Sequence, residues 1–269
     1  MAREWLARSR CCGIVSRLRT ALECHFRALL PLALVGAQLE AGLYTSNNHC
    51  SATSKREIVM YIDRSAIEHF DKRYRAALIN SITGYKPAVL VGSADSDGQS
   101  NLAIMSSLVH LGSHPPLLAL VLRPDSVERH TLSNIRSLRE YTLNHVAAEF
   151  VQAAHQTAAS YPKEVSEFAA TGLTEHWTDQ CAAPFVAEAN VKMQMTLREE
   201  HALAINGTHL VIGEVVGIDL PDAALRDDGS LALTAVDSVA LSGLDSYFRP
   251  ELLRRMAYAK PDSPPKEID

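Results

Sequence analysis

The sequence predicts a mainly β domain with added helices, an α+β fold in which six or so strands form a closed or split β-barrel. Two observations support this prediction. Apolar and polar side chains alternate over residues 191–199, as they do in a half-buried antiparallel strand. Asn206-Gly207 is then a strong hairpin turn, and it leads into a second β-rich run at residues 209–219.

The other elements follow from local patterns. Helical spacing of apolar residues predicts a short amphipathic opening over residues 64–80. Pro87 precedes a β-rich run at residues 88–94, and a turn rich in Asp and Gly leads from it into a second strand at residues 100–108. The remaining expected elements are a strand at 117–122, a helix at 127–138, a strand at 140–146, a helix at 147–159 and a loop-and-helix excursion at 161–177.

Charge and cysteine divide the chain into two parts. Residues 1–59 hold eight basic and four acidic side chains, so the rest holds 18 basic and 27 acidic ones, a balance of −9. The net charge of −5 argues against a nucleic-acid partner, because proteins that follow the phosphate backbone of a nucleic acid usually carry a basic excess. Cys181 is the one cysteine after residue 59, so no internal disulfide can form there, and a reduced, cytoplasmic domain is expected.

We therefore expect three segments: a disordered or non-native leader at 1–59, the barrel domain at 60–260, and a loose tail at 261–269. The apolar stretch of the leader, residues 28–37, is too short to span a membrane, which needs about 20 residues. Two other interpretations of the leader stay open, an amphipathic targeting segment and a metal site. The potential metal ligands, which lack paired C-x-x-C spacing, are Cys11, Cys12, Cys24, His25 and Cys50.

Familiar nucleotide and catalytic motifs are missing: the sequence has no G-x-G-x-x-G after a strand, no P-loop, no G-x-S-x-G and no H-E-x-x-H. Its 11 histidines have no ligand spacing, so no metal is expected in the body. Hydroxyl, amide and cationic side chains do gather on consecutive predicted elements. A flavin mononucleotide (FMN) needs such groups, because its phosphate prefers Arg, hydroxyls and a helix N-terminus, and its flat ring needs an apolar slot.

Fragments in a fixed order resemble the flavin reductase-like (flavoredoxin-type) family over roughly residues 82–220. They are Asn80-Ser81-Ile82-Thr83-Gly84-Tyr85-Lys86-Pro87, Gly98-Gln99-Ser100-Asn101-Leu102-Ala103, Ser106-Ser107, Pro115-Pro116, Arg123-Pro124, Thr131-Leu132-Ser133-Asn134-Ile135, His155-Gln156-Thr157-Ala158, Ser166-Glu167-Phe168 and Gly172-Leu173-Thr174. Each fragment is a weak signal, whereas the ordered set is a strong one. The resemblance implies an FMN-binding split β-barrel that pairs as a homodimer.

The resemblance also implies roles by position. Asn101, Leu102 and Ala103 would line the flavin ring. The ribityl and phosphate end would be held by Ser106 or Ser107, Arg123, Thr131 and Asn134. Thr83 and Lys86, which open the first strand, complete the expected cofactor-binding set. His155 is our candidate catalytic-site residue, lining the nicotinamide slot by hydrogen bonding rather than by acid–base work. Two positions depart from the family pattern: Ile104 stands where proline is frequent, and His130 where an acidic residue is.

Each of these residues also has a structural interpretation. Arg123 could be a solvated strand end, Thr131 an N-cap, and Asn134 a helix-surface amide. Ser106 and Ser107 could be satisfied core hydroxyls. Lys86 could simply be exposed, and His155 could be structural.

The implied reaction is hydride transfer from NADH or NADPH to bound FMN, which then passes electrons to a monooxygenase or another acceptor. A second interpretation is an FMN-binding electron carrier that a partner protein reduces. A third is a split barrel that binds another planar ligand such as haem, against which Arg123, Thr131 and Asn134 favour a phosphate-bearing ligand. The sequence does not separate the first two.

Overall fold

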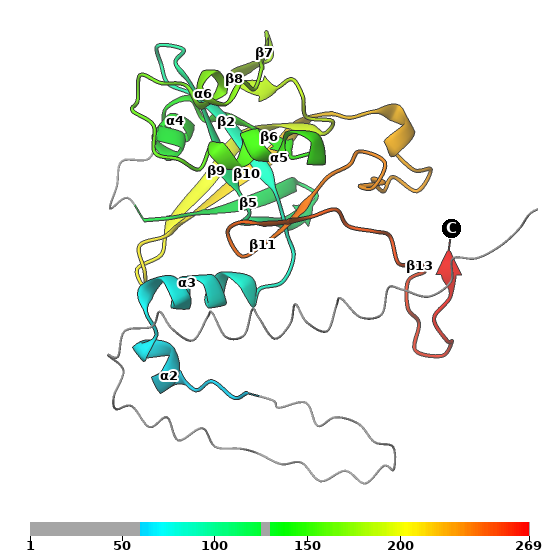
Figure 1. Cartoon of the computed structure of the whole chain (residues 1–269). Helices are drawn as coiled ribbons and strands as arrows, with labels where there is room; N and C mark the ends of the chain where they lie inside the picture. The colour runs from blue at the N-terminus through cyan, green and yellow to red at the C-terminus, as the bar shows by residue number, and fades with distance from the viewer. Residues whose placement is uncertain (1–59, 125–129, 269) are drawn as a thin grey trace, which may run out of the picture. The chain divides into compact units, whose positions relative to one another are not determined.

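The computed structural model describes residues 60–124 and 130–268 (Figure 1). The chain divides into two units, residues 1–69 and 70–269. Within the first unit, the described residues form helix α2 (Arg64–His69), which has no buried residue. The predicted leader, residues 1–59, lies outside the described residues.

The second unit begins with helix α3 (Lys72–Ser81). The Asp71 carboxylate accepts hydrogen bonds from the backbone N–H groups of Arg73 at 2.8 Å and Tyr74 at 3.3 Å, which makes Asp71 the N-cap. The predicted opening at residues 64–80 is therefore two helices, because Asp71 starts a new one.

A seven-stranded antiparallel sheet forms the body of this unit, in the order β3-β2-β6-β9-β10-β5-β4. Its strands are β2 (Val89–Ala94), β3 (Ser100–Met105), β4 (Leu108–Ser113), β5 (Pro116–Leu122), β6 (Glu140–His145), β9 (Lys192–Ala202) and β10 (His209–Asp219). Register shifts interrupt the pairing of β9 with β10 at two places, and such bulges bend and twist a sheet.

The sheet is a split barrel, as predicted. Strands β3 and β4 are its two edges, yet only Ser106 and Ser107 separate them in the chain. The sheet must therefore curl to bring its two edges that close. The edges do not pair with each other, because in the described part of the chain β3 pairs with β2 and β4 pairs with β5. The single strand predicted at residues 100–108 is thus wrong: it ends at Met105, and a new strand starts at Leu108.

Helices and short ribbons complete the unit. The helices are α4 (His130–Leu138), η1 (Ala148–Phe150), α5 (Val151–Gln156), α6 (Glu167–Thr171) and η2 (Asp222–Ala224). The short strands are β1 (Lys86–Pro87), β7 (Glu175–Thr178), β8 (Cys181–Val186), β11 (Ala240–Ser242), β12 (Ser246–Phe248), β13 (Arg255–Met256) and β14 (Glu267–Ile268). No helix within the described ranges is long and apolar enough to cross a membrane.

Several of these elements differ from the prediction. The helix expected at 147–159 is a 3-10 turn followed by α5, and the excursion at 161–177 contains strand β7 as well as α6. Strand β7 pairs with β8 in a ribbon that was not predicted. In the tail, which we expected to be loose, β14 pairs with β13.

The core lies on both faces of the sheet, because side chains alternate along each strand. On β2, Val91 packs into one cluster with Leu120, Leu132 and Met195, while Leu90 belongs to the other. That second cluster also contains Leu102, Val146, Phe150, Ala154 and Phe168. Figure 1 shows α4, α5 and α6 gathered around β2 and β6, so β2 and its edge neighbour β3 are covered on both faces.

Candidate functional site

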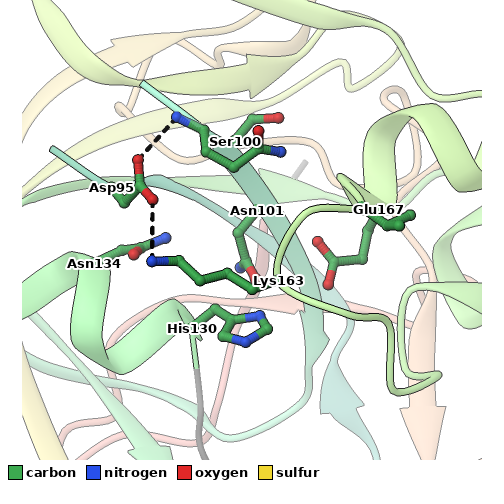
Figure 2. Close-up of a pocket in the computed structure, with 9 residues that line it drawn as sticks. Asp95, Ser100, Asn101, His130, Asn134, Lys163 and Glu167 are labelled. Carbon is green, nitrogen blue, oxygen red and sulfur yellow. Dashed lines mark hydrogen bonds and ion pairs between the residues drawn. The ribbon is translucent and has the colours of Figure 1, made fainter. Parts of the chain in front are cut away.

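A small hollow, open to solvent, lies where the β2–β3 turn, the start of β3, the start of α4 and the segment before α6 come together (Figure 2). Its lining is almost entirely polar. The lining residues are Asp95, Gln99, Ser100, Asn101, His130, Asn134, Lys163, Val165 and Glu167. Two residues of the predicted cofactor set, Asn101 and Asn134, are among them.

Beneath the hollow lies a buried cluster of amides and hydroxyls. The Asn101 amide donates to Thr131 Oγ1 at 2.9 Å and to Ser93 Oγ at 3.3 Å, and the Asn134 amide donates to the same Ser93 hydroxyl at 3.3 Å. All four residues are more than nine-tenths buried. These polar side chains therefore hold one another in fixed positions, which a binding site for a polar ligand requires.

Strand register and helix periodicity bring this cluster together. Ser93 on β2 pairs directly with Asn101 on β3, and Thr131 and Asn134 are three residues apart, on one face of α4. Because side chains alternate, Ala103 and Met105 follow Asn101 on the same face of β3. Both are half-buried, so a strip of small and apolar side chains extends from the polar cluster.

Charged side chains form the rim of the hollow. In Figure 2, Lys163 points toward Asp95, and their N–O distance is 3.4 Å. A hydrogen bond from the Gln99 backbone N–H is the main reason that the pKa of Asp95 lies below its usual value, and the Asp97 N–H and Lys163 add to it. His130, the departure from the family pattern, is the first residue of α4 and lines the same hollow.

The outer edge of β3 is occupied by side chains. The Leu102 N–H donates to the buried Glu167 carboxylate at 2.9 Å, and the Ile104 N–H donates to Thr157 Oγ1 at 2.9 Å. The Leu102 side chain is fully buried in the core. Leu102 therefore offers a ligand neither a free amide nor an exposed side chain. Ile104, the other departure, continues β3 in register with Leu90.

Helix α4 is fixed from its far end by an ionic cluster. Arg136 binds the Glu200 carboxylate with two nitrogens, at 2.9 and 2.5 Å, and His209 Nδ1 lies 2.8 Å from the same carboxylate. Arg136 is the main cause, with His209, of a Glu200 pKa below its usual value. Because Glu200 belongs to β9 and His209 to β10, the cluster holds α4, and with it Thr131 and Asn134, against the sheet.

The remaining predicted residues lie in different places. Arg123 is exposed at the end of β5 and makes no ion pair with any residue that the structure describes. Ser107 Oγ donates a hydrogen bond to the Val121 carbonyl at 2.6 Å, and the neighbouring Ser106 is half-buried. Ser106 follows Asn101 by five residues along the strand, which corresponds to a distance of roughly 16 Å.

Thr83 and Lys86 do not line the hollow. Thr83 Oγ1 donates to the Asn80 carbonyl at 2.9 Å. The Lys86 ammonium donates to the same carbonyl at 3.1 Å and to the Gly243 carbonyl at 3.2 Å. Both side chains thus bind the last turn of α3, and Lys86 also joins it to the turn between β11 and β12.

His155 is exposed on α5 and pairs with Tyr247 of β12. Its Nδ1 lies 3.0 Å from the Tyr247 hydroxyl, and the two rings are nearly perpendicular with centroids 5.7 Å apart. Burial, and then the Asp245 carboxylate, raises the pKa of Tyr247, so this hydroxyl is protonated at neutral pH and can donate to Nδ1. His155 does not line the hollow.

The fold and the buried polar site define a flavin-reductase type of split barrel, and comparison with known proteins identifies the family. The chain belongs to the flavin reductase like domain family, which it matches over residues 84–236. A solved protein from Shewanella frigidimarina NCIMB 400, assigned as a flavin reductase with a split barrel domain, is 45% identical; the alignment covers 75% of this chain and 100% of that one, with a TM-score of 0.72.

Two further relatives are more distant. Nitrilotriacetate monooxygenase component B from Bacillus cereus is 21% identical, with 74% of this chain and 99% of that one covered and a TM-score of 0.65, which shows the shared fold. An uncharacterised protein from Aquifex aeolicus strain VF5 is 27% identical over 145 residues, 53% of this chain and 73% of its own length.

The residues present fit a flavin nucleotide. The buried amides and hydroxyls suit a polyol and polar ring atoms, and the strip from Ala103 to Met105 suits a flat apolar face. Arg123, which is exposed at the end of β5, is a cation of the kind that a phosphate prefers. Sequence reasoning missed Ser93, the hydroxyl shared by both asparagines. Its signal was a serine in an otherwise buried apolar strand, where a hydroxyl needs partners.

Proposed function

We propose that the protein is an FMN-dependent oxidoreductase that transfers hydride from NADH or NADPH to bound FMN and passes the electrons to an acceptor. The observation that carries the proposal is the buried cluster of Ser93, Asn101, Thr131 and Asn134, which opens to the hollow and continues as the apolar strip on β3. Membership of the flavin reductase like domain family supports the same chemistry.

Each part of the site would have its own task. Asn101 and Ala103 would orient the flavin ring, with Leu102 fixing the strand between them. Thr131, Asn134 and Ser106 or Ser107 would bind the ribityl chain, and Arg123 with the N-terminus of α4 would bind the phosphate. When bound, FMN supplies the redox chemistry, so the chain needs to bind, orient and exclude water rather than provide an acid–base pair.

Anaerobic mixing of the FMN-loaded protein with NADH or NADPH tests this function. We expect the flavin absorbance to bleach at a rate that saturates with nicotinamide, because hydride transfer needs the two reacting atoms held about 3–3.5 Å apart. His155→Ala should raise the half-saturating concentration and leave FMN occupancy unchanged, with Tyr247→Phe giving a smaller change. Bleaching by a chemical reductant but by neither nicotinamide would instead make the protein an electron carrier reduced by a partner protein.

The active form is proposed to be a homodimer. Strands β4, β5 and β10 expose apolar side chains, among them Val109, Leu111, Val121, Val216 and Ile218. Water contact with such a surface is unfavourable, and a second copy could cover it. Light scattering at micromolar concentration should give about twice the chain mass of 29.4 kDa. A monomer that retains FMN would contradict the dimer and leave the redox function untouched.

The proposal also names an electron acceptor and a cellular compartment. A monooxygenase component or another electron acceptor would take the electrons, and the flavin-reducing step would occur in the cytoplasm, where Cys181 stays reduced. Burial raises the pKa of the Cys181 thiol, which keeps it protonated and unreactive. Cell fractionation and capture of the acceptor with the FMN-loaded chain would test both statements.

A further inference from the structure

Beside the hollow, a hydrogen-bond network joins the β7–β8 ribbon to the start of β3. Ser100 Oγ donates to Glu175 Oε1 at 2.5 Å and lies 2.6 Å from Ser166 Oγ. The other carboxylate oxygen of Glu175 accepts a hydrogen bond from the Trp177 indole N–H at 2.8 Å. One carboxylate therefore connects an indole ring to Ser100, which lines the hollow.

This network fixes an exposed aromatic ring next to a polar cavity. Trp177 is 42% exposed, although indole burial is normally favourable. Only Glu175 lies between its N–H and Ser100 Oγ, and Glu175 uses both oxygens in the connection. The N–H edge of the ring is thus linked through one carboxylate to Ser100 at the hollow, although Trp177 itself does not line the hollow. The core of the ribbon, Cys181, Ala183 and Phe185, forms without Trp177.

We propose that Trp177 is the stacking surface for a heteroaromatic ring of the nicotinamide dinucleotide that reduces the flavin. This inference rests on the proposed function and adds to it a docking residue for the co-substrate. An indole face suits either the adenine or the nicotinamide ring, because both are planar and stacking does not depend on hydrogen-bond pattern.

Lys163 gives the same place a cation for the phosphates of the dinucleotide. Its ammonium lines the hollow and lies 3.4 Å from Asp95, with 57% of the Lys163 side chain exposed. Lys163 is the exposed partner of this pair, while the Asp95 side chain is 16% exposed, so it is the long Lys163 side chain that can turn its ammonium from Asp95 to a phosphate. His130 lines the hollow as well, whereas the buried Glu167 carboxylate disfavours a phosphate deeper inside. The phosphates are therefore placed at the rim of the hollow, at Lys163.

Calorimetric titration of the FMN-loaded full chain with AMP and, separately, with oxidised nicotinamide mononucleotide tests the site. Neither probe reduces flavin, so binding is measured apart from turnover. Trp177→Ala should weaken binding of one probe by roughly five- to a hundred-fold, and the probe affected tells which ring stacks. Trp177→Phe, which keeps an aromatic face, should retain most of the affinity, and Lys163→Ala should weaken the same probe. Tyr258→Ala removes an aromatic side chain that is 94% exposed elsewhere and should change nothing.

A second measurement keeps the inference testable if Trp177→Ala folds poorly. The chain has two tryptophans, so a Trp5→Phe chain reports Trp177 fluorescence alone, and the stacking probe should quench it in a saturable way. Absence of binding by both probes, or equal affinities in wild type and Trp177→Ala, would overturn the inference. The proposed function is judged separately by flavin bleaching. Bleaching with unchanged titrations refutes only the Trp177 site, whereas probe binding without bleaching refutes the reductase and, with it, the role of Trp177 in docking a reducing co-substrate.

Discussion

Replacing Arg123 by alanine is expected to lower the affinity for FMN by about ten- to a hundred-fold, because a charge-assisted bond to phosphate is worth about 1.5–3 kcal/mol. Arg123 stands at the end of β5, exposed and without an ion-pair partner in the described ranges, and α4 begins at His130. Riboflavin lacks the phosphate, so wild type and Arg123→Ala should bind it about equally. Equilibrium titration of flavin fluorescence with both ligands measures the difference.

A matched variant separates a specific bond from a general change of charge. Arg254 is also exposed, and it pairs with Glu267 in the C-terminal ribbon. Arg254→Ala removes the same charge and should leave FMN affinity within about two-fold, because exposed charges more than a Debye length apart are screened at physiological salt. Equal FMN affinity in wild type and Arg123→Ala would show that Arg123 does not bind the phosphate and is only a solvated residue at the end of a strand.

The largest effect on stability is expected from Gly92→Ala. A methyl group on Gly92 would lie 2.2 Å from the Pro184 carbonyl oxygen and 2.4 Å from Thr142 Oγ1. These two atoms are hydrogen-bonded to each other at 2.7 Å and buried between β2, β6 and β8, so neither can withdraw easily. Overpacking of this kind costs up to about 3 kcal/mol. Urea denaturation should therefore show a midpoint well below that of the wild type.

Gly112→Ala is the control for the glycine change itself. Gly112 also lies in a strand, but the nearest atom to an added methyl group is the Pro115 carbonyl oxygen at 3.5 Å, an ordinary contact. We expect this variant to be close to neutral, with a small gain from the reduced freedom of the unfolded chain. If Gly92→Ala unfolds at the same urea concentration as Gly112→Ala, β8 does not pack against β2 as described.

Long alternating strands could be predicted from sequence, and shorter elements could not. Strand β10 has the predicted bounds, because its alternation and the Asn206-Gly207 turn are local signals. The β7–β8 ribbon was missed because Pro184 lies inside β8, and a proline inside an apolar run argues against a strand. The break between β3 and β4 consists of Ser106 and Ser107 alone, without the Gly, Pro, Asn or Asp that marks a turn most strongly.

In the site, too, some residues could be predicted from the sequence and others could not. Asn101, Thr131 and Asn134 meet in the structure, and the resemblance places them on elements that pack together. The hydrogen-bond partners of Lys86 could not be predicted, because Gly243 comes from a distant part of the chain. The hydrogen bond from the Leu102 N–H to Glu167 could not be predicted either. An acid at the start of a short helix is usually exposed, and only the fold brings it against the Leu102 amide.

The side chains bonded to the outer amides of β3 also bear on self-association. An edge strand with open N–H groups is a template onto which another chain can add a strand and begin to aggregate. At β3 the carboxylate of Glu167 and the hydroxyl of Thr157 occupy two of these groups, and α5 and α6 lie over them. An incoming strand would have to displace a buried acid and a buried hydroxyl before it could pair there. Uncontrolled sheet growth is therefore directed away from the β3 edge, toward the β4 edge, where Val109 and Leu111 are exposed.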